Sequence, residues 1–237
     1  MIKTVLFDLD GTLLPMDQNS FLKDYFGRLI KKMVPHGYDS ELLQKSIWAC
    51  TKAMVQNDGT RSNEEAFWRR FTEIYEKDVR SDEPFFLDFY KNEFQEVRHS
   101  CGFDQRAVDV IHELKERGIR LVLATNPLFP AVATQSRIRW AGLTPEDFEW
   151  ITTYENASFC KPNLDYYREI LVKLNLQPEE CLMVGNDVEE DMIAESLGMR
   201  VFLLTDCIIN PNKMDIHVFS HGGFPELLNY LRSVCLC

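Results

Sequence analysis

Apolar residues are spaced differently in different parts of the chain, as short continuous runs or at helical intervals. A short apolar run at residues 3–8 predicts a buried strand that ends in a carboxylate. From about residue 16 to residue 98, apolar side chains recur at steps of three and four residues, which is the period of amphipathic helices. From about residue 104 onward, helical periods alternate with short apolar runs. The pattern therefore predicts one strand, then a long helical stretch, then alternating helices and strands.

The helical stretch is predicted to contain four helices. Apolar stripes at 22–33 and 43–54 indicate the first two. Ser62 and Glu65 form the capping-box pattern that opens a third helix. A fourth helix, rich in Phe, is predicted at about 84–98. We interpret the many aromatic residues of this stretch as the core of a helical bundle rather than as a binding surface.

The second part of the chain predicts a parallel sheet. Helical periods occur at about 104–117, 130–141, 163–175 and 188–197. Short apolar runs predict strands at 119–124, 149–152, 181–184 and 199–204. Strands that alternate with helices of this length imply right-handed crossovers, with helices on both faces of the sheet. The predicted fold class is α/β, with a three-layer, Rossmann-like parallel sheet core.

The helical stretch interrupts this pattern after its first strand. Such an order predicts an all-helical domain inserted into the first crossover. We predict that residues 1–15 and 100–237 form the α/β core and that residues 16–99 form the inserted helical domain.

Composition narrows the classes of partner. The 237 residues include 26 Lys and Arg against 37 Asp and Glu, a net charge of −11. Nucleic acid or an anionic membrane would select a basic face, so neither is expected as the main partner. No segment approaches the roughly 18 consecutive apolar residues of a membrane span, and no signal peptide is recognised. Seven cysteines, an odd number, are interpreted as mostly buried, reduced thiols, and the predicted location is the cytoplasm.

Polar side chains follow four of the predicted strands. Ligands of open parallel sheets bind at the carboxyl ends of the strands, so these side chains predict one shared site. The residues are Asp8 and Asp10 after the first strand, Thr125 and Asn126 after the second, Lys161 in the loop after the third, and Asp187 after the fourth, with Asp191 on the first turn of the helix that follows.

Two other interpretations of residues 8–11 are less favoured. A calcium loop needs an acid or Asn at its fifth position, Gly at its sixth and Glu at its twelfth. Counted from Asp8, these positions hold Thr12, Leu13 and Asn19. A plain turn is also disfavoured, because the two acids directly follow an apolar strand and other carboxylates follow neighbouring strands.

Several carboxylates at one site require a compensating positive charge, so a divalent cation is expected. Ligation by Asp8, Asp187 and a backbone carbonyl suits Mg²⁺, which keeps several waters and shares a substrate phosphate. Lys161 would be a second fixed positive charge for the same anion. Thr125 and the amide of Asn126 would donate hydrogen bonds to phosphate oxygens. Together these groups predict a phosphoryl-transfer site.

The sequence resembles the haloacid dehalogenase-like (HAD) hydrolase superfamily, in its phosphatase branch with a helical cap, at four motifs: Asp8-Leu9-Asp10-Gly11-Thr12, Thr125, Lys161-Pro162, and Gly185-Asn186-Asp187 with Asp191. The resemblance implies that Asp8 is the nucleophile and a metal ligand. It implies that Asp10 is the general acid/base and gives its backbone carbonyl to Mg²⁺. The inserted helical domain looks like the family's cap.

The same resemblance implies roles for the remaining residues. Thr125 and Asn126 would bind the transferring phosphoryl group. Lys161 would neutralise the nucleophile and the phosphate. Asp187 would ligate the metal, and Asp191 would support the metal shell and orient Lys161.

The expected activity is Mg²⁺-dependent hydrolysis of a small phosphomonoester through an aspartyl-phosphate intermediate, by a monomer or weak homo-oligomer. A phosphomutase of the same fold and a non-catalytic phosphate- or metal-binding regulatory protein remain alternatives. The sequence does not name the substrate, a small phosphorylated metabolite. The basic residues of the helical stretch that are candidates for contact with an anionic substrate tail are Arg28, Lys31, Lys32, Arg61, Arg69 and Arg70.

Overall fold

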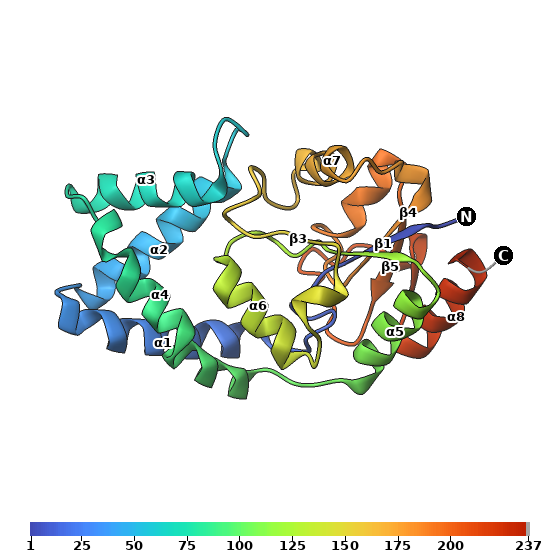
Figure 1. Cartoon of the computed structure of the whole chain (residues 1–237), viewed down its shortest axis with the longest axis horizontal. Helices are drawn as coiled ribbons and strands as arrows, with labels where there is room; N and C mark the ends of the chain where they lie inside the picture. The colour runs from blue at the N-terminus through green and yellow to red at the C-terminus, as the bar shows by residue number, and fades with distance from the viewer. Residues whose placement is uncertain (236–237) are drawn as a thin grey trace.

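A computed structural model describes residues 1–235 (Figure 1). Six strands form one sheet in the order β3-β2-β1-β4-β5-β6, and every neighbouring pair is parallel. The strands are β1 (Thr4–Phe7), β2 (Arg120–Leu123), β3 (Trp150–Ile151), β4 (Cys181–Gly185), β5 (Arg200–Leu204) and β6 (Ser220–Gly222). This is the strand order of a Rossmann-like fold, so the predicted α/β class is confirmed.

Helices cover both faces of the sheet (Figure 1). Val5 and Phe7 of β1 pack in the hydrophobic cluster that includes the helices α5 and α8, whereas Leu6 packs in the cluster that includes α7. Successive side chains of a strand point to opposite faces, so each apolar residue of β1 is buried by one layer or the other. The helices of this part of the chain are α5 (Gln105–Glu116), α6 (Ala131–Trp140), α7 (Leu164–Lys173) and α8 (Phe224–Cys235).

The register of the central strands aligns their carboxyl ends. Phe7, the last residue of β1, lies opposite Leu123 of β2 and Val184 of β4. Strands β2 and β3 are added on one side of β1, and β4, β5 and β6 are added on its other side. The direction in which strands are added to the sheet therefore changes beside β1. The residues that follow these three strands therefore meet at one edge of the sheet, at the topological switch point.

The segment after β4 differs from the prediction. Instead of an α-helix over 188–197, the chain forms turns and then a 3₁₀-helix, η6 (Met192–Leu197). The Asp187 carboxylate accepts hydrogen bonds from the backbone N–H groups of residues 189 and 190, which favours a turn over a helix. Asp191 consequently precedes η6 and does not lie on the first turn of a helix. The sequence analysis made no prediction for β6 or α8.

The helical stretch contains α1 (Gln18–Met33), α2 (Ser40–Val55), α3 (Asn63–Tyr75) and α4 (Glu83–Lys91). The capping box of Ser62 and Glu65 is confirmed at the start of α3. The predicted fourth helix is interrupted at Asn92, whose backbone leaves the helical region (φ −116°, ψ −84°), and the chain continues as the 3₁₀-helix η3 (Glu93–Ser100).

The two ends of the helical stretch lie side by side. Met16 and Cys101 form an antiparallel β-bridge, and the Gly102 N–H donates a hydrogen bond of 2.7 Å to the Pro15 carbonyl. The chain therefore leaves the α/β part and returns to it at one place. The domain boundaries near residues 15 and 100 fall beside this bridge and stay a prediction.

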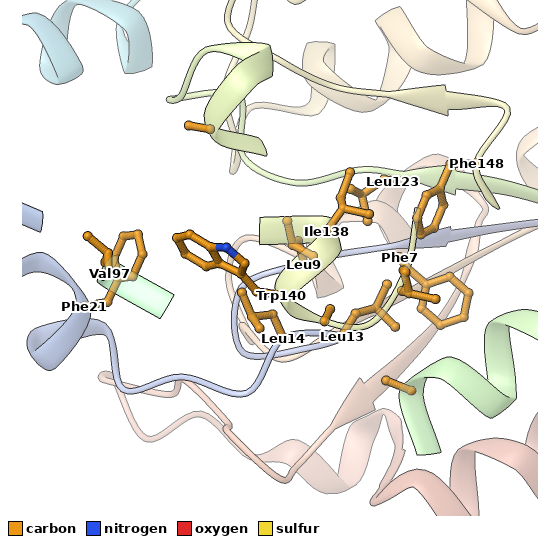
Figure 2. Packing of buried hydrophobic residues seen from close by; sticks show 14 of the residues in the cluster. Phe7, Leu9, Leu13, Leu14, Phe21, Val97, Leu123, Ile138, Trp140 and Phe148 are labelled. Atoms are coloured by element: carbon orange, nitrogen blue, oxygen red, sulfur yellow. The ribbon is translucent and has the colours of Figure 1, made fainter. Parts of the chain in front are cut away.

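A continuous hydrophobic cluster joins the helical stretch to the sheet (Figure 2). In Figure 2, Phe21 and Val97 lie near Trp140 at one end, and Phe7 and Phe148 lie at the other. Ring centroids are 5.0 Å apart for Phe94 of η3 and Trp140 of α6.

Six cysteines fall in the described part of the chain, and all of them carry free thiols. The buried ones are Cys50, Cys160, Cys181 and Cys235. The remaining predicted thiol, Cys237, lies outside the described residues. No helix among residues 1–235 is both long and apolar enough to span a bilayer.

Candidate active site

Asp8 is the first residue after β1 and is fixed by three hydrogen bonds. Its N–H donates to the Val184 carbonyl at 2.9 Å, which continues the sheet by one residue. Its Oδ2 lies 3.1 Å from the Thr12 hydroxyl, and its Oδ1 accepts a 3.0 Å hydrogen bond from Lys161. The Asp8 side chain is largely buried, so only a small part of its carboxylate is exposed to solvent.

Gly11 shapes the turn that follows. Its φ is +88°, a left-handed conformation that a side chain disfavours. A Cβ at this position would also lie 2.3 Å from Nδ2 of Asn186. The turn therefore brings the loop after β1 against the loop after β4, and glycine is required for that approach.

Lys161 lies in the loop before α7 and is only 1% exposed. Its Nζ is 3.0 Å from Asp8 Oδ1 and 2.6 Å from Asp191 Oδ1. Burial opposes the charge of this amine, but the Asp191 and Asp8 carboxylates outweigh burial and raise the pKa of Lys161 well above its usual range. Lys161 is therefore cationic at neutral pH and compensates two buried carboxylates.

Asp191 connects Lys161 to the loop after β4. Its Oδ2 accepts a 2.9 Å hydrogen bond from the Asp187 N–H. A Cβ at Gly185 would lie 2.1 Å from the same oxygen, so glycine makes room for this carboxylate. Burial raises the pKa of Asp191, and the Lys161 ammonium opposes that shift.

Asp10 pairs with an arginine that the sequence analysis did not identify. Arg137 of α6 is 1% exposed and donates a hydrogen bond to Asp10 Oδ2, while its guanidinium carbon lies 4.4 Å from the ring centroid of Phe129. The other oxygen of Asp10 is buried and has no hydrogen-bond partner among the described residues. Burial raises the pKa of Asp10, and the Arg137 guanidinium limits this rise.

Glu190 is a second acid that the sequence analysis missed. It lines the same cavity as Asp187, and its Oε2 accepts a 2.9 Å hydrogen bond from Asn126 Nδ2. Burial raises the pKa of Glu190 to about 7. Glu190 directly precedes Asp191 in the sequence, and this adjacency to a predicted site residue could have identified it.

The side-chain amide of Asn126 donates one of its two N–H groups to Glu190, so its second N–H and the backbone N–H remain as donors for an anion. The backbone N–H groups of Asp10 and Asn126, and the Thr125 hydroxyl, donate no hydrogen bond to any residue in the described range. Buried N–H groups are nearly always satisfied in proteins. Donors left free at the edge of the sheet indicate an anion-binding site.

One cavity of about 260 Å³ brings these residues together. Its lining includes the predicted site residues Asp8, Asp10, Thr125, Asn126, Asp187 and Asp191. Lys161 does not line the cavity. It is buried and pairs with Asp8 and Asp191, whose side chains do line it.

The donor atoms of this cavity fit Mg²⁺. Within residues 1–235, no group of three or more His, Cys, Asp or Glu side chains is arranged to hold a metal ion by itself. Mg²⁺ does not need such a cage, because it commonly uses one or two carboxylates and completes its shell with water and substrate phosphate. Asp8 and Asp187 supply two carboxylates, and the buried, unpartnered Oδ1 atoms of Asp10 and Asn126 make the cavity still more favourable for a cation.

Known proteins with similar sequences and folds agree with this geometry. A family model for haloacid dehalogenase-like hydrolases matches residues 2–194. Glyceraldehyde 3-phosphate phosphatase of Methanothermobacter thermautotrophicus is 24% identical over 207 residues, which cover 86% of each chain. Pyrophosphatase PpaX of Oceanobacillus iheyensis is 25% identical over 207 residues, 87% of this chain and 83% of that protein.

Solved structures share the fold. A HAD phosphatase from Thermococcus onnurineus superimposes with a TM-score of 0.60 at 18% identity, covering 97% of this chain and 98% of that one. CbbY from Rhodobacter sphaeroides, in complex with phosphate, gives a TM-score of 0.57 at 20% identity and covers 96% of each chain. Three of the four motifs line one cavity, Lys161 of the remaining motif pairs with Asp8 and Asp191, and the family model spans most of the length. The chain therefore belongs to the haloacid dehalogenase-like hydrolases.

Proposed function

We propose that this protein is a Mg²⁺-dependent phosphatase that hydrolyses a small phosphomonoester through an aspartyl-phosphate intermediate. The observation that carries the proposal is the Asp8 carboxylate, which faces the cavity with Lys161 3.0 Å behind it and Asp10 two residues further on. The printed names of the relatives, which include phosphatases and a pyrophosphatase, support phosphate as the group acted upon.

In the first step, an oxygen of Asp8 attacks phosphorus, the bond between phosphorus and the ester oxygen breaks, and an acyl phosphate forms. Lys161, 3.0 Å from Asp8, stabilises the negative charge that passes from the carboxylate toward phosphorus. The Thr125 hydroxyl and the free N–H of Asn126 would orient the phosphoryl oxygens. Mg²⁺, held by Asp8, Asp187 and the Asp10 carbonyl, would supply charge neutralisation for the transferring group.

Asp10 would transfer the protons of both steps. In its acid form it gives a proton to the leaving ester oxygen, and the resulting carboxylate then takes a proton from the water that attacks the acyl phosphate. Burial raises the pKa of Asp10, which favours a population of the acid form. Arg137 would act as a positioning residue, because it fixes one oxygen of Asp10 and leaves the other without a hydrogen-bond partner among the described residues.

Release of inorganic phosphate with and without metal tests the proposal. We expect hydrolysis of phosphomonoesters with Mg²⁺, loss of activity with a chelator, and recovery when Mg²⁺ is restored. Asp187→Ala should raise the Mg²⁺ concentration needed for half-maximal rate and lower turnover. Glu189→Ala is the matched control, since Glu189 is adjacent but pairs with Asn212 and does not line the cavity. Activity that is indifferent to the chelator would refute the metal's role, and transfer of phosphate without its release would indicate a mutase.

Asp10→Asn should separate the two chemical steps. Asn can still accept a hydrogen bond from Arg137, so we expect the fold to persist, but it cannot move a proton. A positioned acid/base typically contributes about 10²–10⁴-fold, and turnover should fall by that amount. With an activated aryl phosphate the leaving group hardly needs a proton, so phosphorylated enzyme should accumulate. Intact-protein mass spectrometry of an acid-quenched sample would detect it. Near-normal turnover without accumulation would exclude Asp10 as the acid/base.

A further inference from the structure

A second cavity adjoins the catalytic one and has a different character. It has a volume of about 100 Å³ and lies among α1, α2, α3, α4 and the loop at residues 128–130. Four residues line both cavities: Leu22, Trp48, Leu128 and Phe129. The two cavities are therefore neighbours that share part of an apolar lining.

The second cavity is lined mainly by aromatic and aliphatic side chains. Beyond the shared wall, its lining includes Tyr25, Phe26, Phe67, Trp68 and Phe86. The hydroxyls of Tyr25 and Tyr90, which both line this cavity, pair with each other at 2.9 Å. Apolar walls of this kind bind apolar groups and discriminate against groups that need hydrogen bonds.

No basic side chain of the described residues lines either cavity. Among the described residues that line them, none is Lys, Arg or His, whereas Glu83 lines the second cavity and five acids line the catalytic one. A substrate with a carboxylate or a second phosphate would place that anion where no side-chain cation meets it, at a high desolvation cost.

The six basic candidates of the helical stretch line other hollows. Arg28, Lys31 and Lys32 line a surface hollow beside Glu93, where Lys32 donates to Glu93 at 2.9 Å. The other three candidates, Arg61, Arg69 and Arg70, line another hollow that includes Glu73, and Arg70 pairs with that acid at 3.1 Å. None of the six lines either cavity.

We infer that the preferred substrate is a phosphomonoester of an apolar, uncharged alcohol, whose hydrocarbon part occupies the second cavity. The inference rests on the proposed phosphatase function and specifies its substrate class. An apolar cavity of about 150 Å³ can bind benzene. A cavity of 100 Å³ that adjoins a larger cleft is therefore suited to a short alkyl chain or to part of an aromatic ring.

Trp48 is the residue best placed to set this preference. It lies on α2, lines both cavities and packs against Phe26 with ring centroids 5.5 Å apart. It is 47% exposed, so its replacement should not disrupt the core. The Trp48 ring would cover the hydrocarbon part of the substrate while the phosphate contacts Asp8.

Three alkyl phosphates with unactivated leaving groups test the inference: ethyl phosphate, 2-phenylethyl phosphate and 2-phosphoglycolate, which has a carboxylate in place of the methyl group of ethyl phosphate. Burial of an apolar group the size of a Phe side chain is worth about 10–100-fold in affinity. We therefore expect kcat/KM with Mg²⁺ to be about 10–100-fold higher for 2-phenylethyl phosphate than for ethyl phosphate. For 2-phosphoglycolate we expect a lower value than for ethyl phosphate.

Trp48→Ala should lower the ratio of kcat/KM for 2-phenylethyl phosphate to that for ethyl phosphate toward one. Leu42→Ala is the matched control, because Leu42 is a 40% exposed apolar residue of the same helix that lines neither cavity. This control should keep the wild-type ratio. A wild-type preference for 2-phosphoglycolate, or an unchanged ratio in Trp48→Ala, would overturn the inference and leave the phosphatase proposal standing. No phosphate release from any ester would instead refute the phosphatase proposal itself.

Discussion

Asp8→Asn is expected to abolish turnover and to leave the fold intact. The amide has no anionic oxygen to attack phosphorus, so no acyl phosphate can form. The amide oxygen can still accept a hydrogen bond from Lys161 or Thr12, and Lys161 keeps its 2.6 Å pairing with Asp191. Phosphate release would measure turnover, and intact-protein mass spectrometry would detect any acyl phosphate. Circular dichroism would confirm folding.

Asp24→Asn provides the matched control for this change. Asp24 is a half-buried acid of α1 that pairs with Arg28 at 2.9 Å and lines neither cavity. Its replacement should leave turnover near the wild-type value. Substantial phosphatase activity in Asp8→Asn, together with a phosphorylated protein, would assign the nucleophile to another residue.

Lys161→Met is expected to reduce both stability and activity. The substitution roughly keeps the side-chain length but removes the cation that faces Asp8 and Asp191, and it leaves two buried carboxylates close together without compensation. Removal of one partner from a buried ion pair typically costs about 3–5 kcal/mol. We expect a loss of that order in the free energy of unfolding, measured by urea denaturation at pH 7.

The pH dependence of this loss has a definite sign. Burial already raises the pKa of Asp191 and the Lys161 cation opposes this shift, so without the cation that pKa would rise further and the folded variant would bind more protons than the unfolded chain. The deficit relative to wild type should therefore shrink as the pH is lowered toward the ordinary carboxyl range. Lys52→Met, at an exposed position of α2, should show no such deficit. A Lys161→Met protein as stable as wild type at neutral pH would contradict the compensating role of Lys161.

The parts of the site that were predictable from sequence are those encoded locally. Asp8 and Asp10 follow an apolar run directly, and aligned parallel strands bring their neighbours to the same edge. The structure places Asp187 and Asp191 in the same cavity, as expected from their position after β4. Short-range pattern and strand direction are sufficient for this inference, because the carboxyl ends of parallel strands meet.

The parts that were not predictable depend on long-range contacts, or on side chains that compete with the helix for backbone N–H groups. Arg137 looks like an ordinary helix residue, and only the fold turns it inward to a partner in the loop after β1. The segment after Asp187 has a helical pattern, but the Asp187 carboxylate takes the N–H groups of its first turn. The orientation of Arg28 and its neighbours away from the site depends on how α1 packs, which its own periodicity does not determine.

The hydrophobic cluster that links the helical stretch to the sheet has a consequence for cooperativity. Phe94 and Trp140 belong to the same packed cluster as Phe7 and Leu123, which lie in the sheet. Separation of the two parts would expose apolar surface on both, and this cost couples their unfolding. We therefore expect the helical stretch and the sheet to unfold together in one transition. A substitution in this cluster would weaken the walls of the substrate cavity and the support of the catalytic loops at the same time.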